Sequence, residues 1–242
     1  MEFYTALGKY YDQVFPLGEA QLAFLTKYLD KPGPVADLAC GTGTYARALG
    51  ERGYAVAALD LDGEMVRQAK EKTKGLPVTV FRADMREAAF LLREKGPFAG
   101  AFCIGNSIVH LSSLEEIAAL CQDVAGLLKP GGVFIVQTVN YDWVLAERVA
   151  QLPPIITEEV RFVRKYIYEK PGDPIEFRGE LTYSAGEGSK TLVNSVQLLP
   201  LLSGELQEAL AGAGFKEISL YGNFQEAPHS IKTPATVALA RK

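Results

Sequence analysis

Apolar and polar residues follow two different periods along this chain, and the change comes after Asn140. Up to that point, short apolar runs alternate with segments whose apolar residues recur every three or four positions. Such runs are typical of strands buried on both faces of a parallel sheet, and the intervening segments are typical of amphipathic helices. The expected strands are 35–39, 55–59, 78–81, 98–104 and 133–139, and the expected helices are 18–30, 44–52, 64–74, 87–95 and 114–128. This part predicts a doubly wound α/β domain with a mostly parallel sheet.

A period of two follows, after a short expected helix at 142–150. In one stretch, Ile175 and Phe177 face one way while Glu176 and Arg178 face the other. That alternation predicts an antiparallel β-meander with one solvated face, inserted after the fifth strand within 152–200. Its three expected strands are 158–169, 175–184 and 190–199. A helix at 203–212 and an edge hairpin of strands 216–221 and 235–240 complete a seven-stranded sheet.

Composition narrows the function classes. The 242 residues fit a single domain spanning 1–242, and the net charge of −4 argues against nucleic acid as the main partner. Cys40, Cys103 and Cys121 lie in apolar or helical stretches, so we expect free thiols in a reducing compartment. The spacing of the cysteines and of the two histidines fits no metal site. No signal segment and no apolar run near the ~20 residues of a membrane helix is found, which predicts a cytoplasmic protein.

A glycine loop follows the first expected strand. Gly41, Gly43 and Ala46 fit the dinucleotide pattern G-x-G-x-x-A, and Asp60 follows about 20 residues later, where a ribose-binding acid is expected. A nicotinamide-dependent dehydrogenase is therefore one interpretation. Asp37 argues against it, because a carboxylate at the end of the first strand would repel a pyrophosphate at the helix N-terminus. A ligand with an α-amino group and no phosphate, such as S-adenosylmethionine, would be attracted instead.

The run from Asp37 to Gly43 resembles the first motif of class I S-adenosylmethionine-dependent methyltransferases, and later motifs follow in the family's order over nearly the whole chain. The resemblance implies a Rossmann-like fold, with Asp60 on the ribose hydroxyls and Asp84 on the adenine amino group. Asp84 is also a candidate helix cap with Glu87 as its reciprocal partner. The resemblance extends to a lid segment within 1–30 whose tyrosine closes over the methionine end. The implied cofactor-binding residues are Tyr11, Asp37, Ala39, Gly41, Gly43, Asp60, Leu61, Met65, Ala83, Asp84, Met85, Ile104 and Gly105.

Two further segments look most like small-molecule enzymes of the glycine N-methyltransferase type: residues 105–111 and 140–142. They suggest Asn106 at the methyl-transfer site and His110 as a base, although His110 is equally a candidate cap of the next helix. The meander is expected to cover the acceptor. The candidate substrate contacts are Tyr141, Trp143, Arg161, Arg164, Tyr166, Tyr168 and Arg178.

The prediction is an S-adenosylmethionine-dependent methyltransferase that acts on nitrogen or oxygen of a small molecule by direct in-line transfer. A methyltransferase of tRNA or protein, a nicotinamide-dependent dehydrogenase and a non-catalytic binding protein are the alternatives. The methyl acceptor and the choice between monomer and homodimer stay open.

Overall fold

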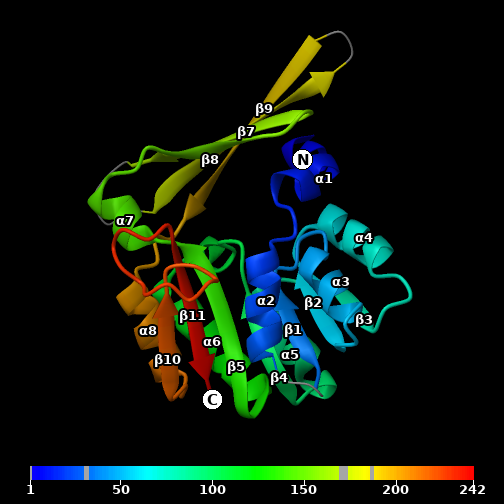
Figure 1. The fold of residues 1–242 in the computed structure, drawn as a ribbon, viewed down its shortest axis with the longest axis vertical. Helices are drawn as coiled ribbons and strands as arrows, with labels where there is room; N and C mark the ends of the chain where they lie inside the picture. Colours follow the sequence, from blue (N-terminus) through cyan, green and yellow to red (C-terminus); the bar gives the residue numbers. More distant parts are fainter. Residues whose placement is uncertain (1, 30–32, 169–173, 186–187) are drawn as a thin grey trace.

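The main sheet of the computed structural model has seven strands in the order β10-β11-β5-β4-β1-β2-β3 (Figure 1). The structure describes residues 2–29, 33–168, 174–185 and 188–242. β1 to β5 pair in parallel, and β11 runs antiparallel between β5 and β10. The strands are β1 Val35–Leu38, β2 Val56–Asp60, β3 Val78–Arg82, β4 Phe98–Cys103, β5 Leu128–Val139, β10 Glu217–Tyr221 and β11 Ala235–Arg241. The predicted mostly parallel, seven-stranded α/β fold with an edge hairpin is confirmed.

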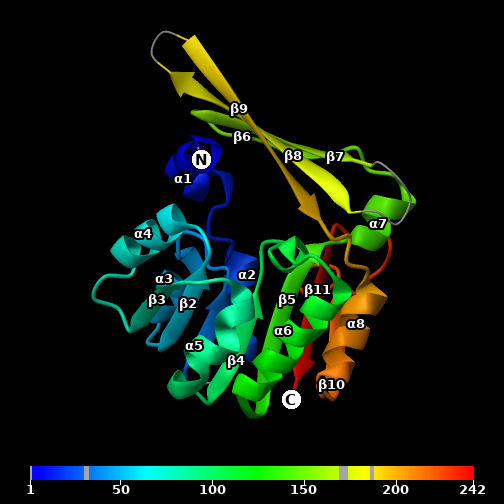
Figure 2. The same ribbon diagram turned by 180° about the vertical axis from the view of Figure 1, so that it is seen from behind.

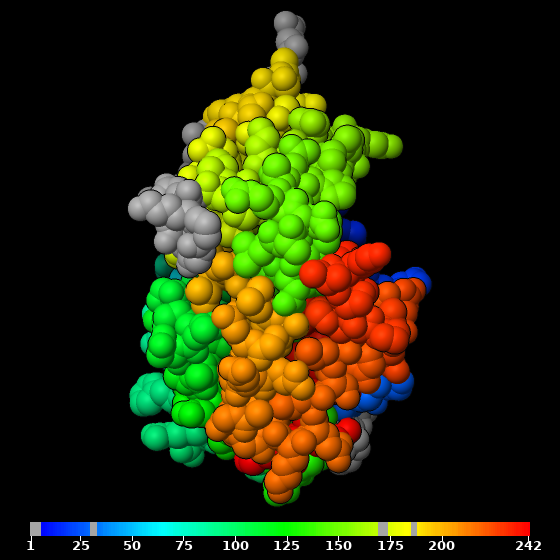
Figure 3. Space-filling view, turned by 90° about the vertical axis from the view of Figure 1, so that its left-hand side faces the viewer, coloured from blue at the N-terminus to red at the C-terminus, as the bar shows by residue number. Residues whose placement is uncertain are grey.

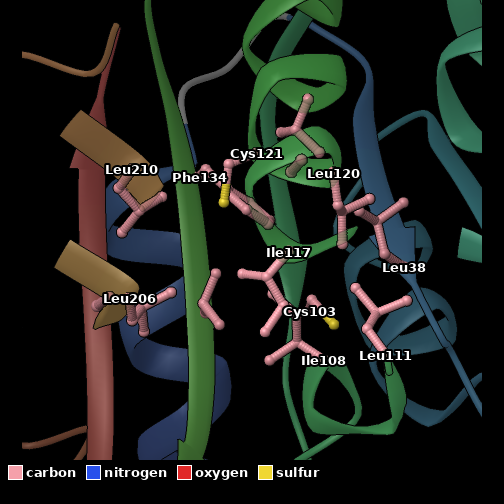
Figure 4. Close-up of a cluster of buried hydrophobic side chains, with 14 of the residues drawn as sticks. Leu38, Cys103, Ile108, Leu111, Ile117, Leu120, Cys121, Phe134, Leu206 and Leu210 are labelled. Atoms are coloured by element: carbon pink, nitrogen blue, oxygen red, sulfur yellow. The ribbon is translucent and has the colours of Figure 1, made fainter. Parts of the chain in front are cut away.

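Helices cover both faces of this sheet (Figures 1 and 2). One face packs against α2 Glu19–Tyr28, α3 Thr44–Gly50 and α4 Gly63–Lys72. The other packs against α5 Ala88–Leu92, α6 Leu114–Leu127 and α8 Ser203–Gly212. Figure 4 shows the core on the α6 side, where Ile117 of α6 lies beside Cys103 of β4 and Cys121 of α6 lies beside Phe134 of β5. The continuous apolar runs therefore reflect strands buried on both sides.

The expected helix at 87–95 is divided into three short pieces. The 3₁₀ turns η1 Met85–Glu87 and η2 Arg93–Lys95 flank α5. A third 3₁₀ turn, η3 Ile108–His110, follows β4. Asp84 caps η1 in a reciprocal pair with Glu87: its carboxylate accepts from the Arg86 amide, and Glu87 accepts from the Asp84 amide at 3.0 Å. The predicted cap at Asp84 is therefore confirmed.

A separate antiparallel sheet follows β5, with four strands where the sequence predicted three. They are β6 Gln151–Ile156, β7 Val160–Ile167, β8 Ile175–Ala185 and β9 Gly188–Leu198. The prediction missed β6 and extended the preceding helix too far; α7 is only Tyr141–Ala146. Pro153 and Pro154 lie in β6, which tolerates them because it is an edge strand with an irregular register between Leu152 and Ile155.

The β6–β9 sheet crosses above the carboxyl ends of the parallel strands, and β8 and β9 extend beyond the main body (Figures 1 and 3). Helix α1, Glu2–Val14, lies beneath this sheet. Val14 of α1 packs in one buried cluster with Phe162 and Leu181. On its other side, the backbone carbonyl of Gly8 accepts from Gln68 Nε2 at 3.0 Å. Helix α1 therefore connects the upper sheet to α4 of the main domain.

None of the helices in the described ranges is long and apolar enough to cross a membrane. The same ranges hold no group of three or more His, Cys, Asp or Glu side chains able to bind a metal ion.

Candidate active site

The strand order places a crevice between the carboxyl ends of β1 and β4. β1 pairs with β2 on one side and with β4 on the other, so the strand order reverses at β1. In open α/β sheets, ligands bind at such a topological switch point, beyond the carboxyl ends of the strands. Two non-glycine residues at this edge have left-handed backbones: Ala39 (φ 62°) and Asn106 (φ 68°). Such strained conformations cluster at ligand sites. The glycine loop after β1 and the loop after β4 are therefore both shaped around this crevice.

A cavity of about 650 Å³ opens at this edge, within the ~300–1,000 Å³ typical of ligand sites. It is bounded by α1, the glycine loop, the ends of β2 and β3, and η3. The predicted cofactor residues that line it are Tyr11, Ala39, Gly41, Asp60, Leu61, Met65, Ala83, Asp84 and Met85. The Leu61 side chain is 64% exposed, so it offers an apolar surface that a bound ligand could cover.

Asp60 holds the glycine loop and presents its carboxylate to the cavity. Its oxygens accept from the Gly41 amide at 2.8 Å and the Asp62 amide at 2.9 Å. Asp37 lies next to it, only 3% exposed. Burial raises the pKa of both carboxyls, and the Asp60 charge raises the pKa of Asp37 further. Two crowded carboxyls favour a cationic ligand and oppose a phosphate.

Asp84 follows β3 and lines the same cavity, and Arg86 holds its carboxylate. The guanidinium donates to both carboxylate oxygens, at 3.1 and 2.7 Å, and lowers the pKa of Asp84. Arg86 also donates to Glu116 of α6 at 2.9 Å. The carboxylate orientation is thereby fixed, and the cap of η1 and a ligand contact can be served by the same side chain.

Four predicted cofactor residues lie outside this cavity. Gly43 (φ 76°) faces α4, where an added Cβ would stand 2.9 Å from the Ala69 Cβ; the glycine permits close packing of α3 and α4. Ile104 is partly buried against the core on the α2 side. Asp37 lies behind the lining residues. Gly105 lines a second cavity instead.

This second cavity, of about 210 Å³, lies between the loop after β4 and the β6–β9 sheet. It shares Leu7, Tyr11, Ser107 and His110 with the first, so the two cavities adjoin across one wall. Its other lining residues include predicted Asn106, Arg164 and Tyr166, together with Phe15, Val139, Leu152, Phe162, Phe177, Gly179, Asn194, Val196 and Leu198. The larger cavity therefore continues into a smaller and mostly apolar one.

Asn106 and His110 both lie at this junction. The Asn106 side chain accepts from the Val139 amide at 2.9 Å and donates to Tyr141 Oη at 3.1 Å, so its amide is fixed. His110 ends η3. Desolvation of its imidazole by the surrounding protein lowers its pKa, so the neutral form dominates at pH 7. The structure gives the cap of α6 to Ser113, which accepts from the Glu116 amide, and not to His110.

The remaining predicted substrate contacts lie outside the second cavity. Tyr141 is buried behind Asn106, and Trp143 packs on the core. Tyr168 donates to the Val149 carbonyl at 2.7 Å. Arg161 is exposed, and Arg178 pairs with Glu176 at 2.9 Å. Strand alternation explains the split: on β7, Arg164 and Tyr166 share the inner face, whereas Arg161 faces outward.

Helix α1 closes the junction from above. An added Cβ on Gly41 would stand 3.1 Å from Tyr11 Oη, so the phenol lies directly on the glycine loop. Asp12 fixes this position by accepting from Thr42 Oγ1 at 2.6 Å and from Lys72 Nζ at 2.6 Å. The predicted lid segment therefore contacts both the loop and the cavities in this structure.

Sequence reasoning missed several lining residues of the second cavity. Phe162 and Phe177 share the inner face of the upper sheet with Tyr166, a period of two that the sequence carries. Asn194 lies on β9 opposite Gly179, and no motif signals it. Ser107 lies between two predicted residues and lines both cavities.

Comparison with known proteins identifies the kind of enzyme. A model of a methyltransferase domain matches residues 35–132, which hold the glycine loop and both strand-end acids, Asp60 and Asp84. In its motifs and sequence the chain is similar to class I S-adenosylmethionine-dependent methyltransferases, and it is a methyltransferase that depends on S-adenosylmethionine. The glycine/sarcosine N-methyltransferase of Aphanothece halophytica is 28% identical over 228 residues, covering 90% of this chain and 80% of the relative. That of Parasynechococcus marenigrum (strain WH8102) is 26% identical over 212 residues, 86% of this chain and 72% of the relative.

Solved methyltransferases share the fold over nearly the full length. An S-adenosylmethionine-dependent methyltransferase from Clostridium acetobutylicum ATCC 824 superposes with a TM-score of 0.81 at 18% identity, covering 98% of both chains. A sugar N-methyltransferase from Streptoalloteichus sp ATCC 53650 superposes with a TM-score of 0.71 at 21% identity, covering 99% of this chain and 93% of that one. The upper sheet therefore belongs to an arrangement that other methyltransferases have.

The cofactor of this methyltransferase is S-adenosylmethionine, and the larger cavity has the donor set that the molecule needs. The carboxylates of Asp60 and Asp84 line it, which suits a ligand with a sulfonium, an ammonium and an adenine amino group. Apolar Leu61 and Met65 line it as well. Lys72 contacts the glycine loop through Thr42, and Asp12 neutralises its charge. Among the described residues, no other Lys or Arg forms an ion pair at this loop.

Proposed function

We propose that this methyltransferase transfers the methyl group to a nitrogen of a small molecule held in the second cavity. The observation that carries the proposal is the wall of Leu7, Tyr11, Ser107 and His110, which both cavities share. A cofactor in the larger cavity and an acceptor in the smaller one would meet across it. The curated relatives act on glycine and sarcosine nitrogens, which supports nitrogen as the nucleophile.

S-adenosylmethionine supplies the methyl group as an electrophilic sulfonium when bound. The protein's task is alignment and exclusion of water, which together can lower a barrier by ~7–11 kcal/mol. Asp60 and Asp84 hold the two ends of the nucleoside. Tyr11, held over the glycine loop, places an aromatic face beside a cationic centre, a favourable arrangement.

His110 and Asn106 act on the acceptor side of this proposal. His110 carries a neutral imidazole, which accepts the proton that an attacking amine must lose. Asn106 has its amide fixed by Val139 and Tyr141, so it orients the acceptor without itself moving. His110→Gln is expected to reduce turnover at pH 6–7 more than at pH 9, where amines are more often deprotonated already.

The volume and cover of the second cavity support a small acceptor over tRNA or protein. About 210 Å³ is below the ~300–1,000 Å³ of drug-sized sites, and β7, β8 and β9 lie across it. The net charge of −4 also opposes a phosphate backbone. The cytoplasmic location stays a prediction from sequence.

A pair of tryptophan variants on β9 tests the proposal. Val196 lines the second cavity, and Val193, on the same strand, is 56% exposed on the opposite face. Val196→Trp is expected to keep S-adenosylhomocysteine binding but to lose methyl transfer to a panel of low-molecular-weight amines. Val193→Trp is expected to keep both. Equal turnover in the two variants would place the acceptor elsewhere.

A further inference from the structure

The second cavity has a specific electrostatic character. Among the described residues that line it, Arg164 is the one with a formal charge at neutral pH, since no Asp, Glu or Lys is present and His110 is neutral. A cationic acceptor would find no counter-charge there and would be repelled. An anionic group would find a guanidinium inside a cavity that is otherwise mostly apolar, where charge interactions are strongest.

Arg164 retains hydrogen-bonding capacity for a ligand. Its Nη2 donates to the Pro153 carbonyl at 2.8 Å, which fixes the side chain against β6. Its Nε is buried and makes no hydrogen bond to any described residue, and no ion pair of Arg164 is found within the same ranges. Nε and Nη2 form one edge of the guanidinium, the forked edge that can bind a carboxylate through two parallel bonds, and the Pro153 carbonyl takes one of the two Nη2 hydrogens.

The strand register leaves room for this fork. Arg164 of β7 pairs with Gly179 of β8, which has no side chain, and both residues line the cavity. Burial also lowers the pKa of Arg164, consistent with a guanidinium that water does not fully solvate. An unpaired guanidinium edge in such a place is costly for the free protein, and an anionic ligand removes that cost.

The rest of the cavity is shaped for an apolar body. Arg164 shares the lining with five apolar side chains: Leu152, Phe162, Phe177, Val196 and Leu198. A single water needs only about 10–15 Å³ of such space, so a cavity of about 210 Å³ has room for a ligand of many non-hydrogen atoms. Glycine or sarcosine would leave most of this apolar surface in contact with water.

We propose that Arg164 binds a carboxylate of the methyl acceptor, and that the acceptor is an amine with an aromatic or branched apolar body, larger than glycine or sarcosine. This inference rests on the proposed function, since it assigns the second cavity to the acceptor. The Arg164 charge also favours the deprotonated amine, the form that attacks.

Calorimetry on the protein saturated with S-adenosylhomocysteine tests the inference. The probes are phenylacetate, phenylacetamide, acetate and glycine. Phenylacetate is expected to bind about tenfold or more tightly than phenylacetamide, the loss expected for a charge-assisted hydrogen bond. It is also expected to bind more tightly than acetate or glycine, which lack the apolar body.

Variants of β7 separate a ligand contact from a structural role. Arg164→Gln is expected to abolish the preference for phenylacetate over phenylacetamide, and Arg164→Lys, which keeps the charge without the fork, to retain part of it. Lys165→Gln removes a neighbouring charge that pairs with Glu180 and faces away, so the preference is expected to persist.

The possible results are distinct. Failure of S-adenosylhomocysteine to bind, or transfer that survives filling of the second cavity, contradicts the proposed function. Normal binding of S-adenosylhomocysteine with no binding of phenylacetate overturns the inference alone. So does equal binding of phenylacetate and phenylacetamide, binding of glycine or acetate as tight as phenylacetate, or an unchanged preference in Arg164→Gln.

Discussion

Replacing Asp60 by alanine is expected to separate cofactor binding from folding. The carboxylate is expected to accept from both ribose hydroxyls, and a hydrogen bond to a charged group contributes about 1.5–3 kcal/mol. Losing two such bonds weakens binding by about 3–6 kcal/mol, or roughly 10²–10⁴-fold in Kd. The free protein also loses an acceptor for the Gly41 and Asp62 amides.

The cost to folding is expected to be much smaller. The two amides are only partly buried, so water replaces some of the lost contact, and removal of a carboxyl whose pKa burial has raised offsets more of it. We expect a loss of about 2 kcal/mol against the ~5–15 kcal/mol typical of a domain, so the variant stays folded.

Titration calorimetry with S-adenosylhomocysteine, alongside thermal denaturation, measures both effects. Asp62→Ala is the matched control, because Asp62 caps α4 by accepting from the Glu64 and Met65 amides, and loss of a cap costs about 1 kcal/mol. Its effect on affinity is expected to be far smaller. Equal losses of affinity in the two variants would show that loop order, and not a ribose contact, accounts for the effect of Asp60.

Three other variants probe the same region. Gly43→Ala is expected to lower the free energy of unfolding by about 2 kcal/mol, since its φ is 76° and the new Cβ would meet α4; Gly53→Ala, with a φ of 81° and nothing within 4 Å, should cost less in a urea titration. The raised pKa of Asp37 predicts that S-adenosylhomocysteine binds more tightly as pH rises from the ordinary carboxyl range towards 7, because a ligand ammonium favours the deprotonated form; Asp37→Asn should flatten this profile, and a wild-type profile already flat would contradict it. Asp12→Asn breaks the ion pair with Lys72 and is expected to accelerate cofactor dissociation in stopped-flow measurements by several-fold, with unchanged rates refuting a role in closure.

The sequence predicted most of the fold because local pattern and position agree there. Continuous apolar runs identified the buried parallel strands, and helix α8 was placed at its observed bounds of 203–212. β6 was missed because Pro153 and Pro154 break strand patterns, and only its position at a sheet edge permits them. Edge position is a tertiary property that a local window does not contain.

The sequence also predicted the cofactor side of the site better than the acceptor side. Asp60 and Asp84 lie on strand ends that a motif identifies, and the structure brings both to one cavity. The acceptor side has no comparable motif. The prediction grouped Arg161, Arg164 and Arg178 together, although a period of two puts Arg161 and Arg164 on opposite faces of β7. The same period puts Arg178 on the outer face of β8, because Phe177 and Gly179 line the cavity, and on that outer face Arg178 pairs with Glu176.

The destination of the methyl group is the sharpest test of the second cavity as the acceptor site. The protein is incubated with S-adenosylmethionine labelled in its methyl group and with a cell extract, which is then separated into low-molecular-weight, protein and nucleic-acid fractions. We expect label in the low-molecular-weight fraction, attached to nitrogen, and its loss in Val196→Trp. Label that accumulates in protein or nucleic acid, unaffected by that substitution, would contradict this assignment.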